Sequence, residues 1–396
     1  MVDSVDFSEI QKKIIKKRIP FQLKVDWFAF TVPEENDIDF KILTDLGYNL
    51  SDFEVIPGQN FYNSGFDLGG YVKIFFNDYS REVRKGSSHT HNYVFTGVGC
   101  SNLQGHIKSW VDCMKMLRYR GVKFRRIDLA LDDFNFEQDI TFEYCEKKLS
   151  RKHFRSSKKK YNILKDKHTN GSPIGETIYY GSLGTSGKDG RVILRQYAKG
   201  LQMMGKHQES ALPQAVLLQK LRPDFDYYHW TRWELEITKA KAETAINEIL
   251  RLADSGYKKP ISRVYYGLLR DTIDFLVPTK NSKTGEILKN KSFWKTSPKW
   301  EKFLKGFDSI QLENPKSIYD LGSVHSWLLY FVMPTIQMLD EIYKKKGLSF
   351  YRVMESLGQC EYSKKQKSLI RDCDQISKAE LMDYAHHFLT DRSDVN

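Results

Sequence analysis

The chain has 396 residues, of which 40% are hydrophobic and 13% aromatic, so it can bury one large core or two of ordinary size and is not a disordered chain. Its formal net charge of +12 at pH 7 indicates a polyanionic partner. The five cysteines are scattered without a C-x-x-C pair, which argues against a zinc site or a disulfide framework and favours a reducing cytoplasm.

No segment of the chain has the pattern of a membrane anchor. Residues 1–18 predict a charged helix and lack the continuous apolar core of a signal peptide. The longest apolar run, residues 327–333, stops at Pro334 and is far too short to span a bilayer. We therefore expect a soluble, cytoplasmic protein that makes no membrane contact.

The first part of the chain predicts a sheet with helices packed on it. Aromatic and β-branched runs predict strands at residues 23–32, 69–77, 92–99 and 123–133. Between the last two, apolar residues recur at helical spacing over residues 103–117. This order of elements predicts the α+β class, with a largely antiparallel sheet and packed helices.

A strongly basic stretch follows a helix predicted over residues 139–149. Residues 151–168 hold eight Lys or Arg against the single Asp166, with Phe154 and Tyr161 among them. A charge run is often only a solvated loop, but aromatic stacking with phosphate neutralisation is how nucleic-acid strands are held. The predicted DNA-binding residues are Arg151, Lys152, Arg155, Lys158, Lys159 and Lys160.

A hairpin follows, in which residues 177–182 and 191–199 flank a glycine-rich turn. Side chains alternate between the faces of a strand, so Arg195, Tyr197 and Lys199 share one side of the second strand. The tyrosine therefore lies between two cations. By itself this pattern also suits a buried core tyrosine.

Two further strands carry paired carboxylates beside arginine. An antiparallel sheet with one solvated face shows the same alternation, but pairs of acids beside arginine favour a site. Carboxylate oxygens are hard ligands that suit Mg²⁺ or Mn²⁺ better than zinc. The predicted metal ligands are Asp128 and Asp132 on the first strand, beside Arg126, and Glu234 and Glu236 on the second, beside Arg232.

Together these three strands predict phosphoryl-transfer chemistry. A metal ion can polarise a non-bridging phosphate oxygen while Tyr197 attacks the phosphorus in line. The products are a 5′-phosphotyrosyl enzyme and a free 3′-hydroxyl, and the covalent bond allows later rejoining. Arg195 and Lys199 would stabilise the charge that develops, and we expect them to favour the phenolate form of the tyrosine.

A histidine pair lies apart from these strands. His89 and His91 have the spacing of the His-hydrophobic-His pair of many nicking enzymes, but Thr90 stands between them. We interpret the pair as a chance occurrence without a catalytic role.

The pattern becomes helical after residue 239. Apolar spacing predicts helices at residues 246–253 and 264–277, then a polar segment at 279–292 and further helices. We place a boundary at residue 240, with a catalytic α+β domain over residues 1–240 and a mostly helical region over residues 241–396.

Seven short motifs occur in the order and with the spacing of a known family. They are VDWFAFTV (25–32), TGVGC (96–100), RIDLALDD (126–133), TIYYGS (177–182), RQYAK (195–199), RWELE (232–236) and SPKWEKFL (297–304). On these motifs the chain resembles the trans-acting rolling-circle replication initiators, a family that includes relaxases of integrative conjugative elements.

The resemblance implies a DNA strand transferase that nicks one strand at an origin with a divalent metal. Tyr197 corresponds to the tyrosine of the family's R-x-Y-x-K motif, and the four carboxylates to its acidic strands. Origin DNA, a host helicase and a homodimer are the implied partners. One departure is Gln202, which stands where the family commonly has an acidic residue.

Two other functions fit parts of the pattern. D-x-x-x-D-D on a strand also suits two-metal nucleotidyl transfer by a polymerase or primase palm, which needs no nucleophilic tyrosine. A DNA-binding protein without catalysis would need only the basic stretch.

Overall fold

The computed structural model divides into two compact units, Met1–Pro315 and Lys316–Asn396, and the sheet and the site described below belong to the first. The predicted helix at residues 1–18 and most of the apolar run at 327–333 lie outside the described residues. No helix in the described part of the chain is long and apolar enough to cross a membrane. The structure describes residues 22–83, 89–134, 136–171, 173–182, 189–206, 229–310, 312, 333–350, 352, 353 and 370.

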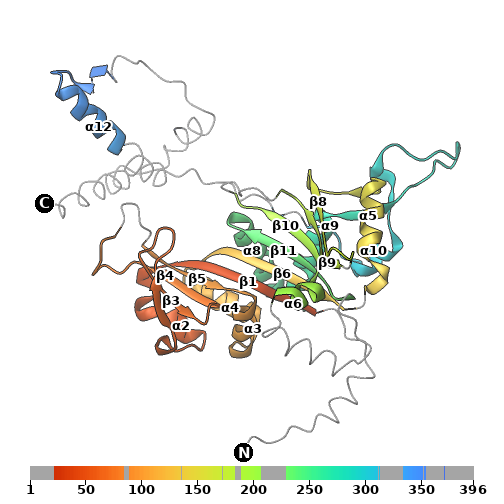
Figure 1. Cartoon of the computed structure of the whole chain (residues 1–396), viewed down its shortest axis with the longest axis horizontal. Coiled ribbons are helices and arrows are strands. Elements are labelled where there is room, and N and C mark those ends of the chain that lie inside the picture. The colour runs from red at the N-terminus through yellow and green to blue at the C-terminus, as the bar shows by residue number, and fades with distance from the viewer. Residues whose placement is uncertain are drawn as a thin grey trace, which may run out of the picture. The chain divides into compact units, whose positions relative to one another are not determined.

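A ten-stranded antiparallel sheet forms the body of the first unit (Figure 1). Its strand order is β2-β3-β4-β5-β1-β6-β11-β10-β9-β8. The predicted α+β class with a largely antiparallel sheet is confirmed. The strands are β1 (Gln22–Pro33), β2 (Glu54–Pro57), β3 (Ser64–Leu68), β4 (Val72–Phe76), β5 (Thr90–Phe95), β6 (Lys123–Asp133), β8 (Tyr161–Lys167), β9 (Pro173–Tyr180), β10 (Val192–Ala198) and β11 (Thr231–Thr238).

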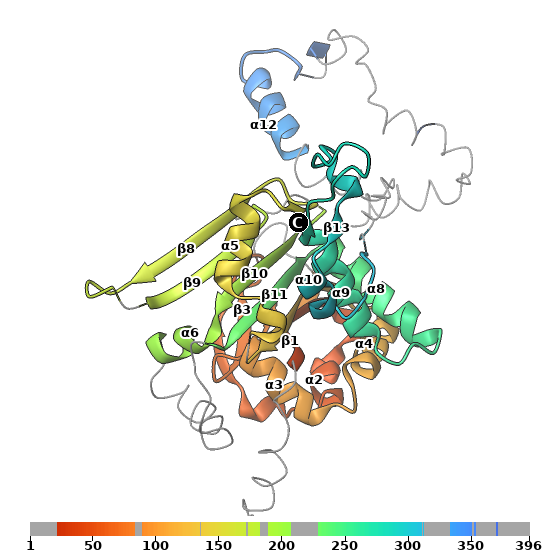
Figure 2. The ribbon, with the colours of Figure 1, turned by 90° about the vertical axis from the view of Figure 1, so that its right-hand side faces the viewer.

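Helices cover one face of this sheet, and Figure 2 shows α8 and α9 beside β10 and β11, with the β8–β9 hairpin extending away from them. Three short strands, β7 (Phe154–Arg155), β12 (Asp274–Val277) and β13 (Lys295–Thr296), form a second sheet. The helices of the first unit are α2 (Lys41–Asp45), α3 (Gly97–His106), α4 (Trp110–Tyr119), α5 (Phe142–Ser150), α6 (Lys199–Lys206), α8 (Ala240–Asp254), α9 (Pro260–Thr272) and α10 (Pro298–Phe303). The second unit contains α12 (Met333–Lys344).

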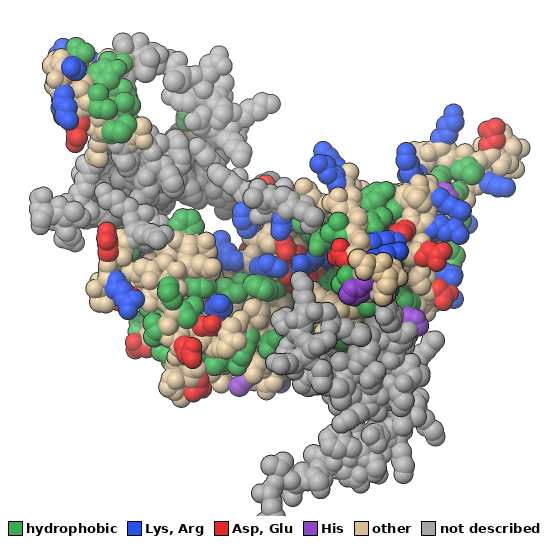
Figure 3. Space-filling view, in the orientation of Figure 1, with side chains coloured by type: hydrophobic (Ala, Val, Ile, Leu, Met, Phe, Trp, Pro, Cys, Tyr) green, Lys and Arg blue, Asp and Glu red, His purple; other side chains and the backbone are tan. Residues whose placement is uncertain are grey.

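The other face of the middle strands is polar. In Figure 3, basic and acidic side chains gather side by side over the middle of the first unit. Every residue of β6 from Ile127 to Asp133 is buried, and so is β11 from Thr231 to Ile237, although both strands alternate apolar and charged residues. The alternating charged residues on the face opposite α8 and α9 are therefore buried as well: Asp128, Asp132, Arg232, Glu234 and Glu236.

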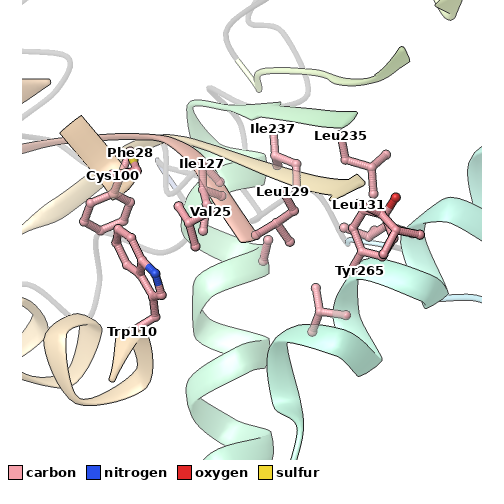
Figure 4. Close-up of a cluster of buried hydrophobic side chains, with 14 of the residues drawn as sticks. Val25, Phe28, Cys100, Trp110, Ile127, Leu129, Leu131, Leu235, Ile237 and Tyr265 are labelled. Carbon is pink, nitrogen blue, oxygen red and sulfur yellow. The ribbon is translucent and has the colours of Figure 1, made fainter. Parts of the chain in front are cut away.

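The hydrophobic core lies between the sheet and the helices (Figure 4). Ile127, Leu129 and Leu131 of β6 point into it, as expected from their alternation with polar residues. From the helix side, Tyr265 of α9 donates a hydrogen bond to the carbonyl oxygen of Trp233 at 2.8 Å, which ties α9 to β11. Cys100, Cys113 and Cys145 are buried as free thiols.

Two predicted helices differ in the structure. The segment predicted as one helix over 103–117 is split into α3 and α4, because the Ser109 side chain accepts a hydrogen bond from Asp112 N and starts a new helix. The helix predicted over 264–277 ends at Thr272, and residues 274–277 form β12 instead. A continuous apolar run does not distinguish a buried helix from a buried strand.

The division at residue 240 stays a prediction. Helices α8, α9 and α10 do follow residue 240, together with the short strands β12 and β13. The compact unit that contains the sheet continues to Pro315.

A pair of glycines in α3 tests how closely this helix packs on the sheet. A Cβ atom at Gly99 would lie 2.2 Å from the carbonyl oxygen of Tyr71, whereas one at Gly105 would meet nothing within 4 Å. We expect Gly99→Ala to lower the free energy of unfolding by about 1–3 kcal/mol through overpacking. Gly105→Ala, the matched control, should raise it by about 0.5–1 kcal/mol. Thermal denaturation followed by circular dichroism measures both, and equal shifts would contradict this packing.

Candidate active site

The register of three neighbouring strands brings the predicted site residues into one polar surface. In β10 and β11, Arg195 lies opposite Glu234 and Tyr197 opposite Arg232. Residues directly opposite each other on paired strands have side chains on the same face. β11 pairs in turn with β6, so the polar face extends over all three strands. On β6, Asp132 lies opposite Arg232, and Asp128 lies opposite Glu236.

Tyr197 is partly buried and donates its hydroxyl hydrogen to Glu234. The distance from Tyr197 Oη to Glu234 Oε2 is 2.9 Å. Burial raises the pKa of Tyr197 well above its ordinary value; the Arg232 charge lowers it, but Glu234 raises it further. The expectation that neighbouring cations favour the phenolate is therefore wrong for this arrangement, in which the hydroxyl keeps its proton and points it at a carboxylate.

Lys199 begins α6 directly after the last residue of β10. Its Nζ donates a hydrogen bond to Gln202 Oε1 at 3.0 Å and lies 5.9 Å from the centre of the Tyr197 ring. Burial lowers the pKa of Lys199 to about 8, and the positive charge of Arg232 lowers it in the same direction. Lys199 thus changes its charge close to physiological pH.

Arg232 is the fully buried centre of an ion-pair network. Its Nε and Nη2 donate to the two oxygens of Asp132 at 2.7 and 2.8 Å, and its Nη1 donates to Asp26 Oδ2 at 2.8 Å. Trp230 Nε1 also donates to Asp132, at 3.0 Å. Asp26 lies in an irregularity of β1 between Val25 and Trp27. Sequence reasoning missed Asp26, although it is a lone acid within an apolar strand motif.

A second network surrounds Asp128. Arg126 donates to both oxygens of Asp128, at 2.9 and 2.6 Å, and its Nη2 lies 3.1 Å from Glu236 Oε2. The other oxygen of Glu236 accepts a hydrogen bond from Arg191 at 2.6 Å. Asp128 is only 2% exposed, and this burial raises its pKa to about 7 against the opposing effect of Arg126.

Arg195 connects Glu234, the partner of Tyr197, to this second network across the strands. Its Nη2 contacts Glu234 Oε1 and lies 3.9 Å from Asp128 Oδ2. Its Nε is buried and has no hydrogen-bond partner among the described residues. Arg195 therefore keeps one buried donor that a ligand could satisfy.

These groups line a pocket of about 500 Å³ over the middle of the sheet. The start of α3 also lines it, and the first N–H groups of a helix favour anions. Tyr197 is not among the lining residues but contacts Glu234, which is. The charged residues of the wall are Lys24, Asp26, Arg126, Asp128, Arg195, Lys199, Arg232 and Glu234.

The four predicted metal ligands differ in how well they suit a metal ion. In the described part of the chain, no three His, Cys, Asp or Glu side chains form a group that could hold one. Both oxygens of each carboxylate are engaged: those of Asp132 by Arg232, those of Glu236 by Arg191 and Arg126, those of Asp128 by Arg126, and those of Glu234 by Arg195 and Tyr197. Only Asp128 and Glu234 of the four line the pocket, and Mg²⁺ commonly takes only one or two protein carboxylates. All four stay predictions, and only their place at the pocket favours these last two.

The basic stretch does not form one uniform surface. Arg155 in β7 is paired with Asp274 at 2.7 Å, and Lys158 is partly buried, which lowers its pKa. Lys159 and Lys160 are exposed just before β8, the edge strand of the sheet. Arg151 and Lys152 are exposed after α5. As DNA contacts, these residues stay a prediction.

The histidine pair lies on and beside β5, away from the carboxylates of β6 and β11. His91 is buried, and its Nδ1 lies 2.8 Å from Asp37 Oδ2, which also accepts a hydrogen bond from Tyr93 at 2.6 Å. His89 Nδ1 lies 2.9 Å from the Tyr79 hydroxyl. His91 therefore has a structural partner of its own.

Comparisons with known proteins point to one group. The family model described as a replication initiation factor matches residues 122–355, which is more than half of the chain. A putative DNA relaxase, NicK, of Bacillus subtilis (strain 168) is 24% identical over 366 residues, covering 89% of each chain. The solved structure of a rolling circle replication initiator protein from Geobacillus stearothermophilus matches with a TM-score of 0.55 and 22% identity. That match covers 74% of this chain and 99% of the other, and it shows a shared fold.

Proposed function

The chain belongs to the replication initiation factor family, and from this premise we propose that it nicks one strand of origin DNA with Tyr197 as the nucleophile. The attack would leave a 5′-phosphotyrosyl bond and a free 3′-hydroxyl, and its reversal would rejoin the strand. The observation that carries the proposal is the hydrogen bond from the Tyr197 hydroxyl to Glu234 beside a pocket lined with cations.

Glu234 is the proposed general base. A tyrosine with a raised pKa needs an acceptor for its proton when it attacks, and Glu234 Oε2 is within hydrogen-bond reach. The proton of Tyr197 moves to Glu234 as the bond to phosphorus forms, and the 3′ oxygen leaves and takes a proton from solvent to become the 3′-hydroxyl. On rejoining, the 3′-hydroxyl gives its proton to solvent as its oxygen attacks phosphorus, and Glu234 returns its proton to the departing Tyr197 oxygen.

The cations of the pocket are the proposed binders of the scissile phosphate. Arg195 has a free buried Nε, and Lys199 Nζ lies 5.9 Å from the centre of the tyrosine ring. Fixed donors aimed at a phosphate stabilise the charge that develops in the transition state. The first turn of α3 adds N–H groups on the same side of the pocket.

A divalent metal, Mg²⁺ or Mn²⁺, is implied by the resemblance to the family. Asp128 and Glu234 are the residues that would hold it. When bound, it would polarise a non-bridging oxygen of the phosphate. Glu234 Oε2 faces the tyrosine and Oε1 faces Arg195, so only Oε1 could serve a metal while Oε2 takes the proton.

Origin DNA is the proposed substrate, and the cytoplasm the proposed location. A host helicase and a homodimer are proposed partners on the strength of the family alone. The exposed Lys159 and Lys160, next to the edge strand β8, are proposed contacts to flanking DNA in the basic stretch.

The first test is formation of the covalent adduct. Purified protein with Mg²⁺ or Mn²⁺ and a supercoiled plasmid carrying its origin should give nicked circles with protein on the 5′ end. Tyr197→Phe should abolish the adduct and retain origin binding, and Glu234→Gln should slow adduct formation about 10²–10⁴-fold. Tyr179→Phe is the matched control, because Tyr179 is a second tyrosine on the same face of the sheet, opposite Arg195 on β9, and is not the proposed nucleophile. This variant should keep full activity.

Three outcomes of this assay would count against the proposal. An adduct with Tyr197→Phe would exclude this tyrosine as the nucleophile. Origin binding by the unaltered protein without any adduct would favour a DNA-binding role without catalysis. Incorporation of nucleoside triphosphates would favour a polymerase-type palm.

A second test uses pH. Lys199 is protonated below its pKa of about 8, so the rate of adduct formation should fall as pH rises through 8. Gln202→Glu places a carboxylate beside Lys199 Nζ, which raises its pKa and should move the fall to higher pH. Lys199→Arg is the control, because arginine keeps its charge and should remove the fall. An unchanged midpoint in Gln202→Glu would exclude Lys199 as the group that titrates.

A third test concerns the basic stretch. Each phosphate contact contributes about 0.9 to the slope of log K against log salt for duplex DNA. Replacing both Lys159 and Lys160 with alanine should lower the magnitude of that slope by about 0.9 for each of the two lost contacts. Fluorescence anisotropy over a salt series measures the slope. Arg251→Ala is the control, since Arg251 is exposed and bonded to Glu248 on α8. Equal slopes for the double variant and the unaltered protein would show that these two lysines do not contact DNA and would favour the interpretation of the stretch as a solvated loop.

A further inference from the structure

A second pocket lies at the end of the same sheet, at the far ends of β1 and β6 from Tyr197, where Thr31 and Asn92 of the polar face and the start of α8 line it. It has a volume of about 780 Å³, and Thr31 and Lys123 line it. These two residues are opposite each other at one end of the β1–β6 ladder, and Gln22 and Asp132 are at the other. Lys123 and Asp132 are nine positions apart on β6, which at strand rise is about 30 Å.

Residues at both pockets lie on one face of β1 and its neighbours. Thr31 lies opposite Asn92 on β5, and both line the second pocket. Two residues before Thr31 on the same strand face, Ala29 lies opposite Arg126, which lines the first pocket. Arg126 packs on the ring of Trp27 at 4.5 Å, and both line the first pocket, so that pocket also holds an aromatic ring beside a cation.

The second pocket is cationic. Lys123, Arg125 and Lys239 line it, and Glu243 is the one acid among the described lining residues. The carboxylate of Glu243 is already engaged, since Oε1 contacts Arg118 and Oε2 accepts a hydrogen bond from the backbone N–H of Phe124 at 2.7 Å. The pocket therefore has an excess of positive charge that its own acid does not neutralise.

An exposed aromatic ring stands at this pocket. Phe61 is 67% exposed, although it is a large apolar side chain. It lies on a turn in which Tyr62 N bonds to Gln59 O at 3.2 Å, and the buried Tyr62 is fixed through its hydroxyl to Thr90 Oγ1 at 2.8 Å. The turn thus presents an unpacked ring beside three cations, which is the composition of a stacking platform for bases.

We propose that this pocket, here called the Phe61 pocket, is a subsite for unpaired nucleotides of the strand that is cleaved at Tyr197. A base stacks on Phe61, and the adjoining phosphates lie against Lys123, Arg125 and Lys239. The inference rests on the proposed function for the identity of the strand. The pocket has the size of a small-molecule site, and stacking on a side chain requires a base that is free of its partner.

The test measures the affinity of the full chain for labelled single-stranded oligonucleotides by fluorescence anisotropy. A short oligonucleotide covers the nick alone, and a long one extends far enough on both sides to reach the Phe61 pocket. Phe61→Ala should weaken binding of the long oligonucleotide about tenfold and leave the short one unchanged. Phe61→Trp should retain the affinity. Tyr119→Ala is the control, because Tyr119 is 92% exposed at the end of α4 and lines neither pocket.

A second variant tests the cations of the pocket. Lys123→Ala with Arg125→Ala should lower the salt slope for the long oligonucleotide by about 0.7 for each lost phosphate contact, and should leave the slope for the short one unchanged. Equal melting temperatures for all variants would show that the fold is intact. If Phe61→Ala proves unstable, this double variant decides the question.

Unaltered affinity of Phe61→Ala and of the double variant for the long oligonucleotide overturns the inference. The inference is also overturned if these variants change the mass measured by sedimentation but not the affinity for the long oligonucleotide, since the pocket would then bind a second copy of the chain. These outcomes are separate from the adduct assay. If Phe61→Ala does not change the affinity but the adduct forms normally, the Phe61 subsite is excluded and the proposed function is unaffected. If Tyr197→Phe still forms an adduct, Tyr197 is excluded as the nucleophile, and the affinity result for Phe61 is unaffected.

Discussion

Charge neutralisation inside the sheet is the constraint on which this structure depends. The middle strands β6 and β11 are buried on both faces, yet one face carries acids and arginines. A buried carboxylate without a partner is costly, so each acid there is matched by a guanidinium, as Asp132 is by Arg232. Because Arg232 also holds Asp26 of β1, one side chain fixes the alignment of several strands and the electric field at Tyr197.

The same arginines are suited to the proposed phosphate chemistry. A guanidinium that binds a carboxylate through two parallel hydrogen bonds can bind a phosphate in the same way. At the pocket wall, Arg126 binds Asp128 and Arg195 binds Glu234. A DNA phosphate that entered the pocket would compete with these carboxylates for the two guanidinium groups. The carboxylates released in such an exchange would be the ones able to take a metal ion. Substrate and metal would then enter the site together rather than independently.

Much of this arrangement could be predicted from the alternation of residues along single strands. Period-two patterns placed Tyr197 with Arg195, and Glu234 with Glu236, on polar faces. Which residues meet across strands depends on register, and register is set by long-range pairing that a single strand does not encode. The hydrogen bond from Tyr197 to Glu234 is therefore visible only in the fold. The ionisation of Tyr197 was wrongly predicted because burial, which raises its pKa, outweighs the nearby cations. Asp26 and Phe61 were missed because neither belongs to a charged pattern.

The partial burial of Tyr197 has a consequence for how long the proposed covalent intermediate survives. A phosphotyrosyl bond is released either by the 3′-hydroxyl of the waiting strand or by water. Glu234 of β11 and Lys199 at the start of α6 lie against the partly buried tyrosine and limit the approach of water, whereas the severed strand end would stay beside it in the proposed site. Rejoining would then outcompete hydrolysis, so that the energy of the broken phosphodiester is conserved until a new 3′ end arrives.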